Sequence, residues 1–466
     1  MTSVEHALAA PPRFRGQWIT PDGDDFEELR WLQNRRIDRK PAIIARPVGV
    51  VDVQESVLLA QQHGLELAVR SGGHGFSGNA AIEGGMQIDL RLMNDVYVDP
   101  ARRIARVRPG ALTGDVVRET IPFGLVPVTG MSSEIGYGGI TLFGGIGYRA
   151  PRYGKTCDNI LSLDVVLADG SLVTASPTSH PDLFWAIRGA GDNFGVVTSF
   201  EVPLYPAPEE ARICTPLFSL DDGGAVLQKL WQLDESLSED LWWSGDVMVQ
   251  PDGSALFGLP LFHLGPKDVA EREIAKIAAL APPARDFEIR TIPYRELFDL
   301  RLHNLDWRTS SRVYFSGVHL NALDAATVDI IVAEAQKLND DQQTPLDAKE
   351  RRIVSIYPFT KGLARTAIPP SVANMSGGLV LFAASWYVDP DQDEGHEQWS
   401  DSVTHRLADA GVTRTGYNAA MHHTVSKLDH DTVRRAFGDK YERLAEIKKR
   451  YDPDNVFRSS ANIIPA

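Results

Sequence analysis

Residues 69–78 form a glycine-rich stretch that constrains the fold of this chain more than any other segment. The stretch holds four glycines within seven residues and follows residues 65–68, whose alternating apolar side chains predict a β-strand. Glycine tolerates positive φ angles and close approach of a ligand, and successive free N–H groups in such a turn can bind an anion such as a pyrophosphate. A plain turn explains the glycines equally well. His74, set between the glycines, would lie beside whatever the loop holds.

A second glycine-rich segment covers residues 136–147, with six glycines in twelve residues. A turn does not require so many. Two explanations are open at this point: a flat ligand packed against the backbone, or backbone segments that crowd one another.

Strand and helix patterns alternate in the first part of the chain. Residues 52–62 predict a helix, with Asp52 as its N-cap and Glu55 three positions later in a capping-box arrangement. An Asp169-Gly170 turn between two apolar runs predicts a hairpin, and residues 181–188 predict a short helix. Together these patterns indicate an α+β or α/β fold class.

The pattern changes after a group of prolines at 203, 206 and 208, which marks a domain boundary. Strand-like runs at 255–261 and 312–315 then alternate with helical stretches at 269–280, 325–338 and 395–409. Strands followed twice by helices predict an antiparallel sheet covered by helices.

Charge and cysteine content argue against several classes of function. A net charge of -15 and a pI near 5.3, without a basic stripe, argue against nucleic acid and anionic membranes as partners. The apolar runs are too short to span a bilayer, and residues 1–12 contain no recognisable secretory signal. The two cysteines, Cys157 and Cys214, provide neither a disulfide framework nor a metal cluster. We therefore expect no metal, no membrane partner and a cytoplasmic location.

Four motifs in this order resemble those of a known enzyme family. They are RSGGH at 70–74, the glycine-rich segment at 136–147, LFWAIRGAGDNFGVV at 183–197 and KKRYDPDNVF at 448–457. The chain thereby resembles the flavin-linked oxidases of the berberine-bridge-enzyme type, within the vanillyl-alcohol-oxidase superfamily. The resemblance covers roughly residues 40–205 and 430–466. Within the family, RLMN at 91–94 and VTGM at 128–131 are similar to the bacterial hydroxy-D-nicotine oxidases.

The resemblance implies FAD as the cofactor, with His74 bonded to the 8α-methyl group of the flavin. It also implies an α+β fold with two domains: an FAD-binding domain of two α/β subdomains at 1–205, completed by residues 425–466, and a substrate domain at 206–424 built on an antiparallel sheet covered by helices. The residues that it places around FAD are Arg70, Ser71, Gly72, Gly73, His74, Gly75, Ser77, Gly130, Gly138, Gly139, Gly144, Gly145, Val197 and Asn455.

The chain departs from the family pattern at several positions. Many members carry a second flavin bond from a cysteine where this chain has Gly136, so a single tether is expected. Ile135 stands where the family often has valine, and the bulkier side chain leaves the choice between oxidase and dehydrogenase open. The Asn-Tyr pair that supplies a base in plant members is missing, and the local match is Gly416-Tyr417.

Four residues are candidates for catalysis, each with a structural alternative. His422 lies where the family tail nears the flavin and could act as a base, or it could be a surface histidine. Tyr417 is the nearest match to the family's tyrosine. Tyr148 could border the pocket or be a packed aromatic. Alternation puts Arg351 on one face of a strand with Ile353, Ser355 and Tyr357, where it could meet a carbonyl or an anion, although an exposed arginine fits an edge strand as well.

The resemblance implies a two-electron oxidation of a small organic substrate, with hydride passing from a C–N or C–O carbon to flavin N5 and with oxygen or another acceptor reoxidising the flavin. The alternative within the same class is oxidative tailoring of a secondary metabolite by cyclisation or oxygenation. A non-enzymatic FAD carrier is the alternative from another class. A nicotinamide dinucleotide fits less well, because no Gly-x-Gly-x-x-Gly opens a helix. Both a monomer and a homodimer are compatible with the sequence.

Overall fold

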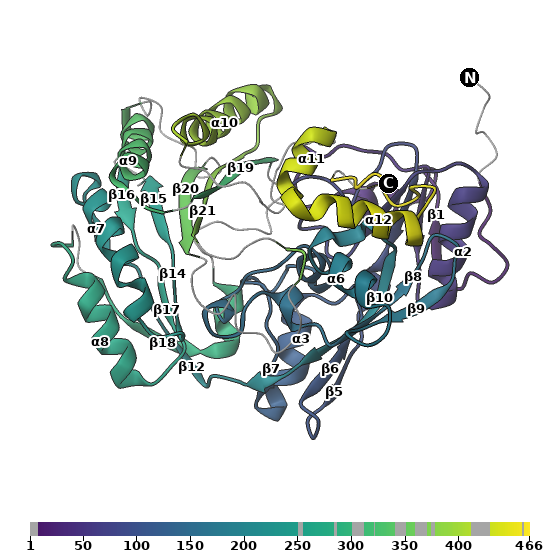
Figure 1. The fold of residues 1–466 in the computed structure, drawn as a ribbon, viewed down its shortest axis with the longest axis horizontal. Coiled ribbons are helices and arrows are strands. Elements are labelled where there is room, and N and C mark those ends of the chain that lie inside the picture. The colour runs from purple at the N-terminus through teal and green to yellow at the C-terminus, as the bar shows by residue number, and fades with distance from the viewer. Residues whose placement is uncertain are drawn as a thin grey trace.

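The computed structural model describes residues 8–249, 255–283, 287–300, 312–320, 322–340, 351–358, 371–373, 378–411, 429–458 and 461–466. Figure 1 shows two lobes, one that contains the N-terminal elements together with α11 and α12, and one that contains the strands and helices between β12 and α10. No helix within the described ranges has the length and apolar character needed to cross a membrane.

The first lobe begins with a four-stranded sheet in the order β1-β2-β4-β3. Its strands are β1 (Gln17–Ile19), β2 (Ile43–Arg46), β3 (Leu67–Arg70) and β4 (Met86–Asp89), and β4 pairs in parallel with both β2 and β3. β3 begins two residues later than the strand predicted at 65–68 and includes Val69 and Arg70, so the glycines at 72–78 follow shortly after the strand ends.

The helix beside this sheet, α2, spans Val50–Gln62 and corrects the predicted N-cap. Its N-cap is Gly49, and Asp52 lies in the first helical turn. The Asp52 carboxylate accepts hydrogen bonds from the backbone N–H groups of Val48 at 2.9 Å and Arg15 at 2.8 Å. Because its acceptor oxygens serve residues outside the helix, the N-cap lies three residues earlier than the capping box suggested.

A five-stranded antiparallel sheet, in the order β5-β6-β10-β8-β9, completes the first lobe. Its strands are β5 (Val96–Asp99), β6 (Ile104–Val107), β8 (Ser162–Val166), β9 (Leu172–Ala175) and β10 (Val196–Pro203). The hairpin predicted at Asp169-Gly170 is confirmed: β8 pairs with β9, and Gly170 has a φ of +78°. The helices that accompany this sheet are α3 (Thr113–Thr120) and α6 (Pro181–Ala190).

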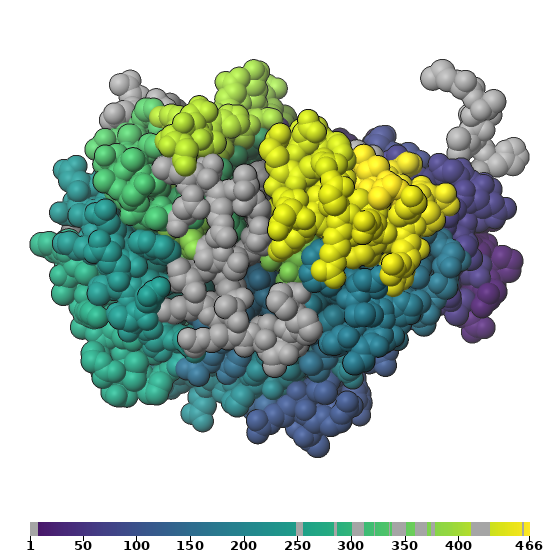
Figure 2. All heavy atoms as spheres, in the orientation of Figure 1, coloured from purple at the N-terminus to yellow at the C-terminus, as the bar shows by residue number. Residues whose placement is uncertain are grey.

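The C-terminal helices share the hydrophobic core of the first lobe. They are α11 (His430–Phe437) and α12 (Tyr441–Tyr451), and Leu444 and Ile447 of α12 are buried in the same cluster as Leu183 and Ile187 of α6. Figure 2 shows both helices, in yellow, lying against the teal surface of that lobe. The end of the chain therefore packs beside segments that it follows by more than two hundred residues.

The second lobe contains a six-stranded antiparallel sheet in the order β13-β16-β15-β20-β21-β19. The strands are β13 (Leu217–Phe218), β15 (Gly245–Val249), β16 (Ala255–Gly258), β19 (Arg312–Leu320), β20 (Arg351–Pro358) and β21 (Leu379–Tyr387). Helices α7 (Leu220–Leu233), α9 (Ala325–Asp340) and α10 (Asp393–Asp409) pack on this sheet. This arrangement confirms the predicted antiparallel sheet covered by helices.

A smaller sheet corrects the strand predicted at 255–261. Its order is β14-β17-β12-β18, with β12 (Glu210–Cys214), β14 (Leu241–Trp243), β17 (Leu261–His263) and β18 (Arg290–Pro293). The predicted run divides between β16 of the large sheet and β17 of the small one. Pro260 lies at the division, because proline has no N–H to donate to a strand ladder.

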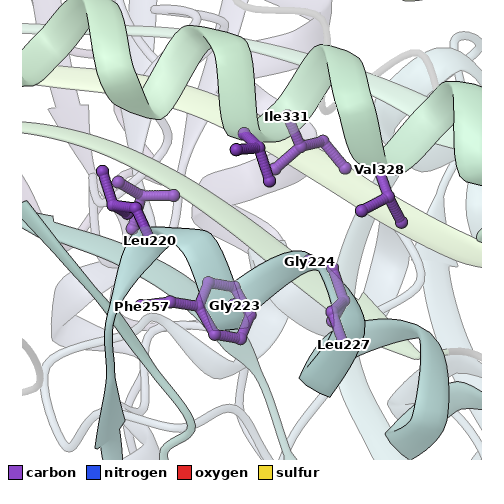
Figure 3. Close-up of a pocket in the computed structure, with 9 residues that line it drawn as sticks. Leu220, Gly223, Gly224, Leu227, Phe257, Val328 and Ile331 are labelled. Carbon is purple, nitrogen blue, oxygen red and sulfur yellow. The ribbon is translucent and has the colours of Figure 1, made fainter. Parts of the chain in front are cut away.

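The side of the large sheet that faces the helices is closely packed. Gly223 and Gly224 bring α7 close to its neighbours: a Cβ on Gly224 would lie 2.7 Å from Val328 of α9, and a Cβ on Gly223 would lie 2.6 Å from Phe257. Figure 3 shows the apolar gap that remains here, about 10 Å³ in volume. A gap of this size and character does not hold a ligand.

Candidate functional site

A cavity of about 450 Å³ lies between the glycine-rich segments of the first lobe and the large sheet of the second. Residues 71–77, which follow β3, line one side together with residues of the segment 135–146. The opposite wall comes from β19, β20 and β21. The cavity therefore has a floor of exposed backbone and a wall of side chains from a rigid sheet.

The two glycine-rich segments meet at the floor of this cavity. A Cβ on Gly72 would lie 2.6 Å from the backbone nitrogen of Gly136, so neither position accommodates a side chain. By contrast, a Cβ on Gly75 or Gly139 would meet no atom within 4 Å. Crowded backbone therefore accounts for Gly72 and Gly136, whereas Gly75 and Gly139 leave open space at the cavity.

His74 lines the cavity from the middle of the first glycine-rich segment. Burial lowers the pKa of its imidazole to about 4, since desolvation disfavours the charged form. The ring is therefore neutral at physiological pH. A neutral imidazole offers a nitrogen lone pair that a protonated ring does not.

Most of the predicted cofactor residues line the cavity. These are Ser71, Gly72, Gly73, His74, Gly75, Ser77, Gly138, Gly139, Gly145 and Val197. The other four candidates, Arg70, Gly130, Gly144 and Asn455, are not part of the lining.

Arg70 and Gly144 support the cavity floor from behind. The Arg70 guanidinium donates a hydrogen bond to the carbonyl of Leu29, and burial lowers its pKa to about 10. The Gly144 carbonyl accepts hydrogen bonds from the Cys157 N–H at 2.9 Å and the Thr156 hydroxyl at 2.8 Å.

The strand β20 presents its residues to the cavity as the alternation predicted, with one exception. Ile353, Ser355 and Tyr357 line the cavity, whereas Arg351 does not. Arg351 is the first residue of β20 and lies four positions, about 13 Å along the strand, from Ser355. Alternation therefore predicted the face of the strand on which Arg351 lies. It did not predict that Arg351 is absent from the cavity lining.

Tyr148 is a packed aromatic residue and does not line this cavity. Its ring centre lies 4.8 Å from that of Phe262, 5.7 Å from Trp242 and 6.1 Å from Phe298. Burial raises the pKa of its phenol, and its hydroxyl has no hydrogen-bond partner among the described residues. The structure therefore corrects the expectation that Tyr148 borders the pocket. The other two catalytic candidates, Tyr417 and His422, lie outside the described residues.

Several lining residues were not identified from the sequence. The aromatic ones are Phe76, Phe143, Phe315, Phe382 and Trp386. Phe382 and Trp386 flank Ala384 with a period of two, and that period in an apolar run is the signal that could have revealed them. Among the described residues, no group of histidine, cysteine, aspartate or glutamate side chains is placed to hold a metal ion.

Two family models match the chain, one at each end. A model described as FAD binding domain matches residues 41–176, and one described as berberine and berberine like matches residues 390–464. The first covers both glycine-rich segments of the cavity floor.

Similar proteins cover the chain from end to end. The (R)-6-hydroxynicotine oxidase of Paenarthrobacter nicotinovorans is 32% identical over 461 residues, which is 98% of each chain. The crystal structure of 6-hydroxy-D-nicotine oxidase from Arthrobacter nicotinovorans superposes with a TM-score of 0.87 at 31% identity, covering 98% of this chain and 100% of the other. A shorter match, 36% identical over 207 residues, links 44% of this chain to 39% of a Fusarium proliferatum protein named FAD-dependent monooxygenase FUP4.

Proposed function

Because the chain belongs to the FAD-linked oxidoreductases of the berberine-bridge-enzyme family, we propose that it oxidises a small organic molecule by two electrons in the cavity between its two lobes. The observation that carries this proposal is the position of His74. It stands in the glycine-rich floor of a cavity whose far wall is a rigid sheet of side chains. Such a cavity can hold a cofactor against one side and a substrate against the other.

The floor of the cavity fits FAD. Within the described part of the chain, the backbone N–H groups of Gly72, Gly73 and Gly75 have no hydrogen-bond acceptor. Unpaired N–H groups in a glycine-rich turn suit the pyrophosphate oxygens of a dinucleotide. Gly138, Gly139 and Gly145 would lie against the flat ring, and the neutral His74 imidazole would bond to the 8α position. When bound, FAD accepts a hydride at N5 and passes the two electrons to oxygen or another acceptor.

The contribution of the chain itself is to bind and orient. The open space above Gly75 and Gly139 gives a flat ring access to the backbone, and the sheet wall holds a substrate against that ring. Water is excluded on the sheet side by the apolar side chains Ile353, Phe382 and Trp386. A covalent bond to His74 would prevent dissociation of the cofactor during turnover.

The test is an absorbance spectrum of the purified protein before and after acid precipitation. We expect flavin absorbance that stays with the precipitated chain, and a His74→Ala variant that releases the flavin into the supernatant. A His180→Ala variant is the matched control, because His180 is exposed and contacts Tyr451 far from the cavity. A colourless protein would refute the proposal, and flavin released by acid from the unaltered chain would refute the covalent bond.

A second measurement distinguishes an enzyme from a flavin carrier. The bound flavin of an oxidase is reduced by dithionite without air and is reoxidised when air is admitted, with release of hydrogen peroxide. A flavin that neither dithionite nor sulfite affects would indicate a carrier. Failure of air to reoxidise it, with recovery by an artificial acceptor, would indicate a dehydrogenase.

Oxidative tailoring of a secondary metabolite is the second candidate function. The aromatic wall of the cavity and the match to a protein named as a monooxygenase favour it. Turnover under labelled oxygen separates tailoring by oxygenation from simple oxidation, because a monooxygenase transfers one labelled atom to its product and an oxidase transfers none.

A further inference from the structure

Asn34 is a buried residue of the first lobe whose side chain contacts both sides of the cavity. It lies between α1 (Phe26–Arg30) and β2, with an exposed fraction of 1%. Its Nδ2 group donates hydrogen bonds to the carbonyls of Phe76 and Val313, each at 2.9 Å. Phe76 lines the floor two residues after His74, and Val313 belongs to β19 of the opposite wall. A single amide group therefore connects the two sides.

The hydrogen-bonding capacity of the Asn34 amide is fully used. A primary amide offers two N–H donors and two oxygen lone pairs. Besides the two donated bonds, Asn34 Oδ1 accepts the backbone N–H groups of Val313 at 2.9 Å and Arg36 at 3.1 Å. All four partners are backbone groups with fixed roles, so they determine the orientation of the amide. No charged or apolar side chain of this size can make the same four bonds.

Val313 directs both of its backbone groups to the Asn34 amide. β19 is the last strand in the order of the large sheet, and no strand among the described residues pairs with its outer edge. The amide takes the place of such a strand, because it accepts the N–H and donates to the carbonyl of one residue, as the opposed residues of an antiparallel pair do. This pairing fixes the position of β19 relative to the first lobe.

An aromatic contact joins the same two segments inside the cavity. The rings of Phe76 and Phe315 stack with their centres 5.8 Å apart and their planes inclined by 27°. Phe315 lies two residues beyond Val313 on β19, so both side chains are on one face of the sheet. The hydrogen bonds of Asn34 hold the backbone of both stacking segments. The amide thereby determines how close the floor and the wall lie where the rings meet.

Ion pairs connect these segments nearer the surface. Arg36 Nη2 lies 2.8 Å from Glu397 Oε2 of α10, and Arg312 Nε lies 2.6 Å from Asp393 Oδ1. Both carboxylates are partly exposed, so salt screens the pairs and each contributes little alone. The neutral amide is buried and unaffected by salt. It is therefore the contact best suited to hold the two sides at a constant separation.

We propose that Asn34 is a positioning residue for the oxidation, and that its amide sets the separation between the floor that holds the flavin and the wall that holds the substrate. Reacting atoms must approach to about 3–3.5 Å, and a displacement of about 1 Å can lower a rate about 10²-fold. Asn34 is not part of the cavity lining and acts through Phe76 and β19. This inference rests on the proposed function, because the separation matters only if the floor holds a flavin.

The rate at which sulfite adds to the flavin tests the inference without a substrate. Sulfite forms a bond to N5 with its own electron pair and bleaches the flavin absorbance, and it must pass between the floor and the wall. We expect Asn34→Ala to form the adduct about tenfold faster than the unaltered protein, because loss of one net hydrogen bond raises the population of a more open arrangement by about that factor. Hydrogen–deuterium exchange of the β19 peptide that contains Val313 should also become faster, a result that does not depend on the flavin.

Asn159→Ala is the matched control, because Asn159 is an equally buried asparagine whose contacts stay within the first lobe. Its exposed fraction is 3%, its Nδ2 donates to the carbonyls of Tyr153 at 2.9 Å and Lys155 at 2.7 Å, and its Oδ1 accepts the Tyr205 hydroxyl at 2.6 Å. This variant should lose stability in urea, as Asn34→Ala does, and keep the rate of adduct formation within about twofold.

Three results would overturn the inference: adduct formation in Asn34→Ala within twofold of the unaltered protein, an equal acceleration in Asn159→Ala, or unchanged exchange in β19. If Asn34→Ala does not fold, Asn34→Asp decides, since it keeps the shape and the two accepted bonds and loses both donated ones. Failure of the proposed function is distinguishable, because it shows as a protein without flavin. A flavoprotein whose adduct formation does not respond to Asn34 refutes the positioning role alone.

Discussion

Replacement of Lys448 by methionine should loosen the C-terminal segment that packs beside the cavity. The Lys448 ammonium is fully buried, lies 2.6 Å from Asp452 Oδ2, and donates hydrogen bonds to the carbonyls of Asn193 and Phe457. Asp452 in turn accepts the N–H groups of Val456 at 2.8 Å and Phe457 at 2.9 Å. Methionine has similar length but no charge, so the substitution leaves a buried carboxylate without its cation. Removing one partner of such a pair costs about 3–5 kcal/mol.

Hydrogen–deuterium exchange of the peptide that contains Val456 and Phe457 measures this loss. A change of about 3–5 kcal/mol in the free energy of local opening corresponds to exchange about 10²–10⁴-fold faster at these amides. Lys449→Met is the control, since Lys449 is exposed and should leave the exchange unchanged. The double variant with Asp452→Asn should regain part of the loss, because the buried charge is removed. Exchange within threefold of the unaltered protein, in the Lys448 variant, would refute the reasoning.

Three further substitutions test the site. Tyr148→Phe should leave turnover unchanged and raise the free energy of unfolding by up to about 1 kcal/mol, because it removes a buried hydroxyl without a partner; a large loss of turnover would contradict the packed position. Gly72→Ala should cost about 1–3 kcal/mol in urea unfolding and reduce bound flavin, because its Cβ would lie 2.6 Å from the Gly136 nitrogen. Ile135→Val should raise the rate of flavin reoxidation by oxygen in stopped-flow, since Ile135 lines the cavity; an unchanged rate would show that this side chain does not limit oxygen access.

Local sequence patterns were sufficient for most of the fold. Tyr441, Leu444 and Ile447 recur at helical spacing and form the buried face of α12, and the Asp169-Gly170 turn predicted the β8–β9 hairpin. Each of these depends on residues a few positions apart. The prediction of Asp52 as the N-cap failed for a different reason. The Asp52 carboxylate accepts a hydrogen bond from the N–H of Arg15, and no local sequence pattern reveals that contact.

The cavity floor was predictable for the same reason, and parts of the wall were not. The glycines of 72–75 are contiguous in sequence, so a single motif placed them around His74. Tyr148 follows the second glycine-rich segment, but its position in the sequence did not show that its side chain packs in an aromatic cluster. Alternation in β20 predicted the face on which Arg351 lies, but not that Arg351 is absent from the cavity lining.

The pairing of Asp246 with Ser355 is a part of the cavity wall that a single sequence does not predict. Asp246 and Ser355 are about 110 residues apart, and they meet because β15 and β20 pair in one register. A shift of one residue would turn Asp246 toward the helices, where Val247 and Val354 now pack. A family motif therefore transfers the cofactor site, which is encoded locally. The far wall of the cavity depends on strand register in the second lobe, so relatives that share the floor of the cavity need not share its wall.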